Sequence, residues 1–333
     1  MPSQALPRPD PVSRLPVVIL MIKSSCNCRC AMCDIWRDKT GREMPLELVE
    51  DWLEQLHALH TREIVLSGGE PLMHSEVEKI CAAARSCGFR LTLLTTGLLL
   101  KRHAPWISRG IDRIYVSLDG PAAVHNRIRN IPGAYAKLAA GISAVRSLAP
   151  NLPIGARCTI QQGNFRNLNE TVAAARQLGL DSISFLAADI LPGHFSRPDP
   201  WTQNGIALSS TDLPALRSVL DRLYAEKARE FADGFIVESP EKLEHKLYQY
   251  FQALAGTGDY PAVHCNAPWV STVIETDGRL RPCFFHRPYP GHPVEQPLEQ
   301  IINSAPAKDW RQSLDMLRDP ICKRCVCTLA RSE

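Results

Sequence analysis

Short apolar runs alternate with longer amphipathic segments over the first 190 residues. The apolar runs have the length of buried strands, and the segments between them carry apolar residues at helical spacing. The predicted strands are 17–22, 63–67, 90–95, 113–118, 154–160 and 182–187. The predicted helices between them are 44–57, 75–87, 98–109, 134–148 and 167–178.

This alternation predicts an α/β fold with a parallel sheet, because a strand, a helix and the next strand join by a right-handed crossover. Six such units predict a partial (β/α)6 barrel. In barrels of parallel strands the functional residues lie at the carboxyl ends of the strands. We therefore expect the chemistry of this chain at that face.

The remaining segments have other patterns. Residues 1–16 are rich in Pro, Arg and Ser and predict a flexible arm that can lie across the domain. From Leu191 the chain becomes rich in Pro, Gly and His, which predicts a linker or lid before helices at 212–231 and 240–254. A hairpin over 271–283 turns at Asp277-Gly278, and a helix follows near 308–317. The predicted organisation is an arm (1–16), a barrel (17–190), a linker with helices (191–260) and a small C-terminal domain (261–333).

Composition excludes several classes of protein. The chain has 333 residues, of which 45% are hydrophobic, and its net charge is +3. Disorder is therefore excluded, and neither nucleic acid nor an anionic membrane is indicated as a partner. No apolar run is long enough to cross a bilayer and no signal peptide is recognisable, so we expect a cytoplasmic protein. The clustered spacing among its 12 cysteines favours metal binding over disulfides.

Cys26, Cys30 and Cys33 form a C-x3-C-x2-C motif directly after the first predicted strand. Thiolates are the ligands that iron–sulfur clusters take. Three ligands leave one iron of a four-iron cluster free for a small molecule, as catalytic metal sites keep an open position. A zinc knuckle or a group of inert buried cysteines is the alternative. Cys28, inside the same loop, is expected to be a bystander.

Together with Gly68-Gly69-Glu70 after the second predicted strand, this motif resembles the radical S-adenosylmethionine (radical SAM) superfamily. The resemblance implies a [4Fe-4S] cluster on the three thiols, with S-adenosyl-L-methionine bound at the open iron. It also implies reductive cleavage to a 5′-deoxyadenosyl radical, which abstracts a hydrogen atom from the substrate. The cofactor carries that chemistry and the protein orients it. An external reductant such as flavodoxin or ferredoxin is expected to supply the electron.

The same resemblance assigns residues to the S-adenosylmethionine site. Gly68, Gly69 and Glu70 would meet the methionyl amino group, and glycines let the backbone approach a ligand closely. Hydrogen bonds to the ribose and to the methionyl carboxylate would come from Ser117, Asp119 and Arg129. The alternatives are helix caps for the first two and a solvated surface side chain for Arg129. The chain departs from the family at two positions, with Thr96 where Asn is frequent and Met32 where an aromatic residue is frequent.

A second group of cysteines lies near the C-terminus. Cys265, the pair Gly278-x4-Cys283 and Cys322-x2-Cys325 resemble the twitch region, a shortened relative of the SPASM domain. This resemblance implies an auxiliary [4Fe-4S] cluster on Cys265, Cys283, Cys322 and Cys325, which Cys327 could join in place of one of them. Four thiolates leave no iron of the cluster open, so electron relay is expected. A four-thiolate structural zinc is the alternative.

Other reactive residues are given structural roles. Core positions are expected for Cys81, Cys87 and Cys158, and either Arg157 or Cys158 should face the barrel interior because neighbouring strand residues alternate. Loop positions, and therefore solvated side chains, are expected for Asp189, His194 and His286.

The predicted function is that of a radical SAM enzyme, an oxidoreductase or lyase. Sixteen residues before the barrel are too few for a precursor-binding module, which favours a small hydroxylated substrate of aminocyclitol, sugar or nucleoside type. Dehydrogenation, dehydration and decarboxylation remain open. One alternative is a peptide or protein side-chain maturase with its recognition module on a separate chain. A further enzymatic alternative is the molybdenum-cofactor cyclase family, which is characterised by a C-terminal Gly-Gly tail. This chain ends Ala330-Arg-Ser-Glu333 instead, which disfavours that family. A non-enzymatic zinc or iron–sulfur electron-transfer protein is the alternative of another class.

Overall fold

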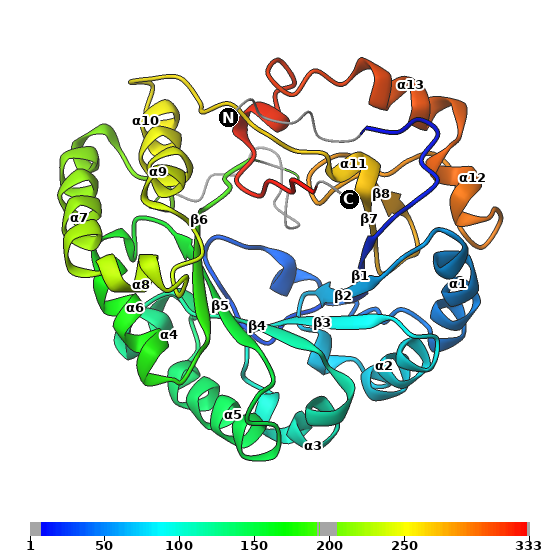
Figure 1. Cartoon of the computed structure of the whole chain (residues 1–333), viewed down its shortest axis with the longest axis horizontal. Helices are drawn as coiled ribbons and strands as arrows, with labels where there is room; N and C mark the ends of the chain where they lie inside the picture. The colour runs from blue at the N-terminus through cyan, green and yellow to red at the C-terminus, as the bar shows by residue number, and fades with distance from the viewer. Residues whose placement is uncertain (1–7, 192, 194–204, 332–333) are drawn as a thin grey trace.

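Six parallel strands form a curved sheet with helices on its outer side (Figure 1). The computed structural model describes residues 8–191, 193 and 205–331. Each strand pairs in parallel with the next one along the chain. The strands are β1 (Val17–Lys23), β2 (Glu63–Gly68), β3 (Arg90–Thr95), β4 (Arg113–Ser117), β5 (Ile154–Ile160) and β6 (Ser182–Ala187). The predicted α/β fold and its six strands are confirmed.

The outer helices follow the predicted alternation. They are α1 (Leu46–Ala58), α2 (Val77–Ser86), α3 (Leu100–Gly110), α4 (Ala122–Arg129), α5 (Ala134–Leu148) and α6 (Leu168–Gln177). The longer helices bury an apolar stripe, as α1 does with Val49, Trp52 and Leu56. The sequence analysis missed α4, which is short and polar and ends at Asn130 in the left-handed conformation with φ of 51°.

The sheet continues beyond β1 into the C-terminal region. β7 (Ser271–Ile274) pairs in parallel with β1, and β8 (Leu280–Arg281) returns antiparallel, which confirms the predicted hairpin. The strand order is β6-β5-β4-β3-β2-β1-β7-β8, so β6 and β8 are the two edges of an open sheet. The C-terminal hairpin is therefore fixed to the barrel by backbone hydrogen bonds.

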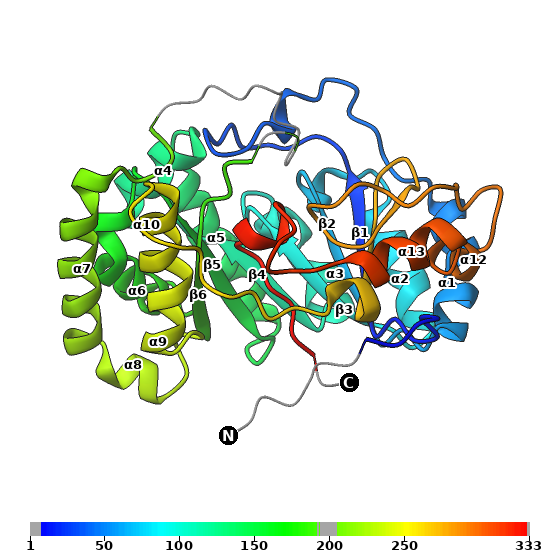
Figure 2. The same ribbon diagram turned by 90° about the horizontal axis from the view of Figure 1, so that it is seen from above.

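Helical segments over 210–254 cover the β6 end of the sheet, opposite to α12 and α13 (Figure 2). The predicted helix 212–231 occurs as two helices, and the predicted helix 240–254 contains a π-helical stretch. The segments are a 3-10 turn (Ser210–Asp212), α7 (Leu213–Glu226), α8 (Ala228–Ala232), α9 (Pro240–Leu243), the π-helix (Glu244–Gln249) and α10 (Tyr250–Leu254). A bridge between Ile183 and Ile236 joins them to β6. Most of the predicted lid, 192 and 194–204, lies outside the described residues.

The C-terminal helices are short. They are α11 (Ala267–Val270), α12 (Leu298–Ile302), α13 (Ala305–Ser313) and a 3-10 turn (Cys322–Arg324). The helix predicted near 308–317 is therefore α13, which begins earlier because Pro306 fits its first turn. Within the part of the chain that the structure describes, no helix combines the length and the apolarity needed to cross a membrane.

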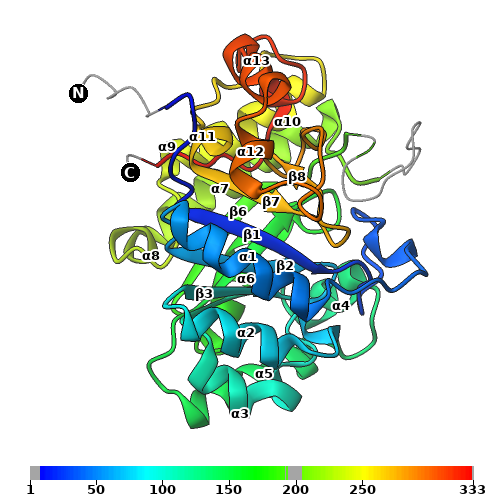
Figure 3. The same cartoon turned by 90° about the vertical axis from the view of Figure 1, so that its right-hand side faces the viewer.

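The N-terminal arm lies beside the C-terminal helices (Figure 3). The Val12 backbone N–H donates to Asn303 Oδ1 at 2.8 Å, and Asp10 forms an ion pair with Arg311 at 2.9 Å. Val12 and Leu15 are buried in the main core. These contacts hold residues 8–16 against the rest of the molecule, as expected for an arm that lies across the domain, and residues 1–7 lie outside the described part.

Candidate active site

A cavity of about 280 Å³ lies at the carboxyl ends of the strands. Cys26, Cys30 and Cys33 border it from the loop after β1. The opposite wall comes from the C-terminal region and consists of Phe284, Phe285, Val326 and Cys327. The first predicted cluster site and the C-terminal cysteine region therefore meet at a single cavity.

The thiol loop provides a suitable environment for cluster ligands. The backbone N–H of Cys28 donates to Cys26 Sγ at 3.5 Å, and Arg129 Nη1 donates to Cys30 Sγ at 3.6 Å. A hydrogen bond from the Cys28 thiol lowers the pKa of Cys30 to about 7, and the Arg129 charge adds to this shift while burial opposes it. Donors aimed at sulfur stabilise thiolates, so the three residues fit the iron–sulfur cluster that the motif implies.

Cys28 differs from the three predicted ligands. Its side chain is buried and is not among the described residues that line the cavity. Hydrogen bonds to Cys26 and Cys30 raise its pKa, so this thiol keeps its proton and acts as a donor. Cys28 therefore supports Cys26 and Cys30 by hydrogen bonding and does not itself face the cavity.

Gly68 and Gly69 border the cavity, but glycine is needed at both positions because neighbouring backbone lies too close for a Cβ atom. A Cβ atom on Gly69 would lie 2.1 Å from the Ser25 carbonyl oxygen, and one on Gly68 would lie 2.3 Å from that of Lys23. The Gly69 N–H donates to the Lys23 carbonyl at 2.7 Å. The glycines therefore let the end of β2 pack directly against the segment that leads into the thiol loop. The sequence predicted a close approach of these glycines to a ligand, whereas the close approach in the structure is to backbone.

The Glu70 carboxylate lies away from the cavity and is fully buried. It accepts hydrogen bonds from the Thr96 N–H (2.7 Å), the Thr96 hydroxyl (2.6 Å), the Thr95 hydroxyl (2.8 Å) and the Leu72 N–H (3.0 Å). Burial raises the pKa of Glu70, and these donors oppose the shift. The side chain joins the ends of β2 and β3, so of the predicted Gly-Gly-Glu contacts only the two glycines border the cavity.

Thr96 connects that junction to the thiol loop. Its hydroxyl lies 3.0 Å from Asn27 Oδ1, within the cysteine motif. The sequence left this position undecided because the family frequently has Asn there. In the structure the threonine hydroxyl links the ends of two strands to the predicted cluster loop.

Three ligand-contact residues were predicted at and after the end of β4. Ser117 faces the cavity, and the other two, Asp119 and Arg129, form an ion pair. Ser117 and Arg129 border the cavity, whereas Asp119 is completely buried. Arg129 Nε lies 2.6 Å from Asp119 Oδ2, and the Thr159 N–H donates to Asp119 Oδ1 at 3.3 Å. Asp119 therefore holds the guanidinium that also contacts Cys30. In this geometry Asp119 contacts Arg129 and does not face the cavity in which a ligand would lie.

Arg157 is a cavity residue to which the sequence gave no role. It lies opposite Ser117 in the pairing of β4 with β5, and its side chain is directed into the cavity. Cys158 is buried on the other face of the strand, where Asn164 donates to its sulfur at 3.7 Å. The alternation of neighbouring strand residues indicated that one of Arg157 and Cys158 faces the barrel interior. The burial of the two side chains in the structure shows which one it is.

Two loop residues expected to be solvated are buried. Asp189 is 4% exposed and borders the cavity, and His286 is 5% exposed beside the C-terminal cysteines. The expectation of solvated side chains is wrong for both, because the C-terminal region covers this side of the barrel. His194 lies outside the described residues.

Five C-terminal thiols lie close enough to interact electrostatically: Cys265, Cys283, Cys322, Cys325 and Cys327. The Ala267 N–H donates to Cys265 Sγ at 3.4 Å, and Cys325 Sγ donates to the Cys327 carbonyl at 3.0 Å. Burial, together with the neighbouring thiols, raises the pKa of Cys283 to about 11, although hydrogen bonds from the Phe285 and His286 backbone oppose the shift. Gathered thiols with backbone donors fit an iron–sulfur cluster, which would bind them in the deprotonated form.

A second hollow, of about 270 Å³, adjoins the first one. The two share Ile35, Gly69 and Phe284 in their walls. The charged residues that line the second hollow come from the chain after β1 and from the β7–β8 hairpin: Lys23, Asp38, Arg42, Glu275, Asp277, Arg279 and Arg281. Because its lining is strongly charged, this hollow provides a polar neighbour to the thiol-lined cavity.

Profiles of known families match both cysteine regions. The radical SAM superfamily matches residues 21–160, and the SPASM iron–sulfur cluster-binding domain matches residues 265–326. The second match favours a cluster over structural zinc at the C-terminal thiols.

Curated relatives support the same assignment. The chain is 26% identical to the AdoMet-dependent heme synthase of Methanosarcina barkeri over 90% of this chain and 83% of that protein. It is 28% identical to the pre-heme d1 synthase of Dinoroseobacter shibae and 31% identical to the GTP 3′,8-cyclase of Pseudomonas fluorescens. The last two matches span 53% and 52% of this chain, and 45% and 54% of those relatives.

Solved structures share the fold. SuiB of Streptococcus suis, solved with S-adenosylmethionine bound, superposes with a TM-score of 0.65 over 94% of this chain and 72% of its own, at 14% identity. With the precursor peptide SuiA, the same protein gives a TM-score of 0.65 at 13% identity, over 91% of this chain and 67% of its own. The cofactors of the chain are a [4Fe-4S] cluster, S-adenosyl-L-methionine and an auxiliary iron–sulfur cluster. The chain therefore contains a radical SAM domain and a C-terminal SPASM iron–sulfur cluster-binding domain, and it is an iron–sulfur enzyme.

Proposed function

We propose that this enzyme oxidises an amphipathic substrate that carries carboxylates, of the tetrapyrrole type. The observation that carries the proposal is the composition of the shared cavity. Three thiols border one side, and a thiol of the C-terminal group borders the other. Most of the exposed surface between them is apolar, although polar side chains such as Thr95 and Thr159 also line it. Its apolar residues are Met32, Ile35, Leu94, Leu186, Ala188, Phe284, Phe285 and Val326. Such a wall favours a substrate with a large apolar body.

The residues around the cofactor take separate roles. When bound, the first cluster and S-adenosylmethionine supply a 5′-deoxyadenosyl radical that removes a hydrogen atom from the substrate. Cys26, Cys30 and Cys33 hold that cluster, and flavodoxin or ferredoxin serves as its reductant. The S-adenosylmethionine contacts come from the cavity-facing members of the predicted set, Gly68, Gly69, Ser117 and Arg129, while Glu70 and Asp119 fix them from behind.

Arg157 adds a cation to this site. It lies across from Ser117, so a carboxylate in the cavity can meet a hydroxyl and a guanidinium together. On the opposite wall the auxiliary cluster is held by Cys265, Cys283, Cys322 and Cys325, with Cys327 as the alternative fourth ligand. The electron that an oxidised substrate gives up leaves toward that wall.

The adjoining hollow supports the substrate class. Lys23, Arg42, Arg279 and Arg281 line it, beside the acidic residues that pair with some of them. A flat apolar molecule in the thiol-lined cavity can extend its carboxylates into this charged space. The Methanosarcina barkeri relative, which matches over 90% of this chain, is named a heme synthase, which agrees with such a substrate.

Polyhydroxylated and peptide substrates have weaker support. A small hydroxylated substrate would need polar partners along a wall that is mainly apolar. The peptide-bound structural neighbour shares only 13% identity with this chain, so its likeness concerns the fold. These two classes are the alternatives that the following experiment separates.

The test uses reduced, anaerobically reconstituted enzyme with S-adenosylmethionine and iron coproporphyrin III. We expect saturable binding in the tetrapyrrole absorbance band, and a product that has lost hydrogen or carbon dioxide by mass spectrometry, formed together with 5′-deoxyadenosine. Cys30→Ala should form no 5′-deoxyadenosine and no product, while still binding the tetrapyrrole. Absence of binding, or turnover of an aminocyclitol or a peptide in its place, would overturn the assignment of substrate class.

A further inference from the structure

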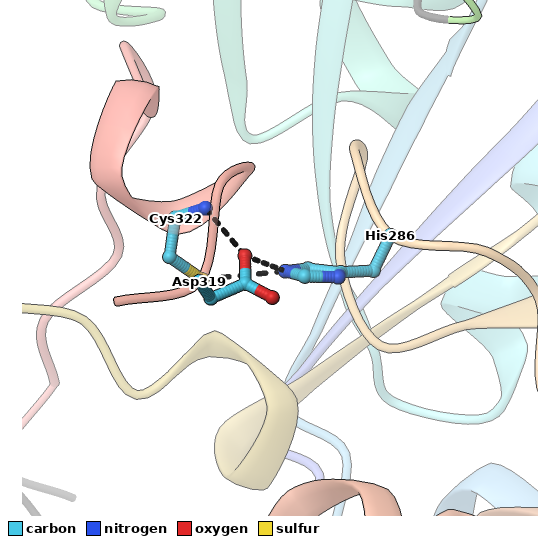
Figure 4. Close-up of side chains that lie close together, drawn as sticks. All are labelled: His286, Asp319 and Cys322. Atoms are coloured by element: carbon cyan, nitrogen blue, oxygen red, sulfur yellow. Dashed lines mark hydrogen bonds and ion pairs between the residues drawn. The ribbon is translucent and has the colours of Figure 1, made fainter. Parts of the chain in front are cut away.

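The side chains of His286, Asp319 and Cys322 lie close together in the C-terminal region (Figure 4). His286 Nε2 lies 3.3 Å from Cys322 Sγ and 3.7 Å from Asp319 Oδ1. The histidine comes from the segment after β8, three residues beyond Cys283, whereas its two partners come from the last turn of the chain. One buried imidazole therefore joins the two segments that supply the predicted cluster ligands.

The imidazole is fixed in this position from several directions. Its ring packs edge-to-face on Trp310, with 4.8 Å between the ring centroids. Arg281 Nη1 donates to the His286 carbonyl at 3.0 Å. Asp319 is fixed as well, because its Oδ1 accepts the Ile321 N–H at 2.9 Å and the Cys322 N–H at 2.8 Å. A side chain confined in this way can support a directed hydrogen bond.

The direction of that hydrogen bond follows from the chemistry of the two acceptors. A cysteine that binds iron is a thiolate, and Asp319 is a carboxylate, so neither can donate to Nε2. The imidazole must then carry its proton on Nε2 and donate. Hydrogen bonds to the sulfur ligands of an iron–sulfur cluster stabilise the more negatively charged, reduced state and raise the reduction potential.

We infer that His286 is a positioning residue of the auxiliary cluster, which donates a hydrogen bond from Nε2 to the Cys322 thiolate and raises the reduction potential of that cluster. Asp319 accepts the Cys322 N–H and so sets the orientation of the Cys322 backbone, and its Oδ1 lies 3.7 Å from the same Nε2. The inference rests on the proposed ligand role of Cys322 and is independent of the substrate. A centre with a raised potential is a better acceptor for an electron that leaves the substrate.

The experiment measures the auxiliary cluster by redox titration followed by electron paramagnetic resonance. It uses the full-length, reconstituted enzyme, and the Cys26/Cys30/Cys33→Ala variant identifies the auxiliary signal because it lacks the first cluster. His286→Leu removes the donor, and His286→Gln keeps an N–H donor of similar reach. His292→Gln is the matched control, since His292 lies in the same region and contacts the Asp277 carbonyl at 2.7 Å.

We expect His286→Leu to shift the auxiliary midpoint potential to a more negative value with full iron content, about eight iron atoms per chain for two [4Fe-4S] clusters. His286→Gln should restore part of the shift, and His292→Gln should leave the potential unchanged. An unchanged potential in both His286 variants would overturn the inference. Loss of the auxiliary iron in both would also overturn it, because His286 would then be a ligand. Stoichiometric zinc bound beside two intact clusters in the wild type would overturn it too, since the three side chains could themselves hold an ion.

Discussion

Arg129 is the residue at which the charges of the active site meet. Its guanidinium contacts Asp119 and the sulfur of Cys30, and all three side chains are buried. Paired burial makes such a group expensive to disturb, because a lone buried carboxylate has no compensating charge. The sequence predicted Arg129 and Asp119 separately as ligand contacts, and the structure makes them partners.

Replacing Arg129 should therefore destabilise the fold. We expect Arg129→Gln to lower the free energy of unfolding by about 3–5 kcal/mol, because Asp119 is left buried without its cation. Denaturant unfolding of the cluster-free protein measures this. Arg127→Gln is the control, since Arg127 is exposed and its side chain donates to the Gly163 carbonyl. Equal stability of the two variants would show that the Arg129–Asp119 pair is not structurally important.

At the scale of elements, the end of β2 determines where the thiol loop lies. The Gly69 N–H donates to the Lys23 carbonyl at the end of β1, and the Glu70 N–H donates to the Ser25 carbonyl just after it. Thr96 ties the end of β3 to Asn27 of the loop. The parallel sheet thus brings together three strand ends, and the predicted cluster site is built on that junction.

A methyl group at position 69 should disrupt the cluster loop. A Cβ atom there would lie 2.1 Å from the Ser25 carbonyl oxygen, a backbone atom that cannot move without shifting Cys26. We expect Gly69→Ala to lose most of the first cluster, which is about half of the bound iron in a protein with two [4Fe-4S] clusters. Iron and sulfide analysis after anaerobic reconstitution measures this loss.

Gly163→Ala is the matched control for that measurement. A Cβ atom on Gly163 would meet Ile128 at 3.6 Å, which is an ordinary packing distance. Its iron content should equal that of the wild type. Full iron in Gly69→Ala would mean that the loop tolerates displacement and that the close approach is not required.

At the scale of the whole molecule, the sheet itself joins the two cysteine regions. β7 pairs with β1 from Val17 to Leu20, and the thiol loop begins shortly after β1 ends. The cavity has one wall from each region, and the backbone hydrogen bonds between β1 and β7 join the two regions. The N-terminal arm is joined to the C-terminal region as well, through the Asp10–Arg311 ion pair.

Removing an auxiliary ligand should separate the two halves of the reaction. We expect Cys265→Ala to keep reductive cleavage of S-adenosylmethionine, because Cys26, Cys30 and Cys33 are untouched, while oxidation of the substrate falls by at least about tenfold, or about 1.4 kcal/mol in the barrier. Chromatographic assay of 5′-deoxyadenosine and of product in the same reaction measures both. The control is Cys87→Ala, because Cys87 is exposed and the core position that the sequence predicted for it is wrong. Equal loss of both products would indicate that the auxiliary region supports the whole fold.

The sequence by itself determined the local elements and the ligand chemistry of this protein. Hydrophobic periodicity depends on neighbouring residues, so β3, β5, β6 and α5 match their predicted ranges, and the spacing of Cys26, Cys30 and Cys33 indicated the cluster type. Short polar elements such as α4 were missed because they lack a long apolar stripe.

Only the tertiary structure decided which side chains face the cavity. Glu70 and Asp119 lie behind it, Arg157 points into it, and His286 is buried against Cys322, because these arrangements depend on contacts between residues far apart in the chain. The pairing of β7 with β1, across more than 250 residues, is of the same kind. Composition and spacing identify the groups that bind metal, but burial and orientation assign each group its role, and these arise when distant segments pack together.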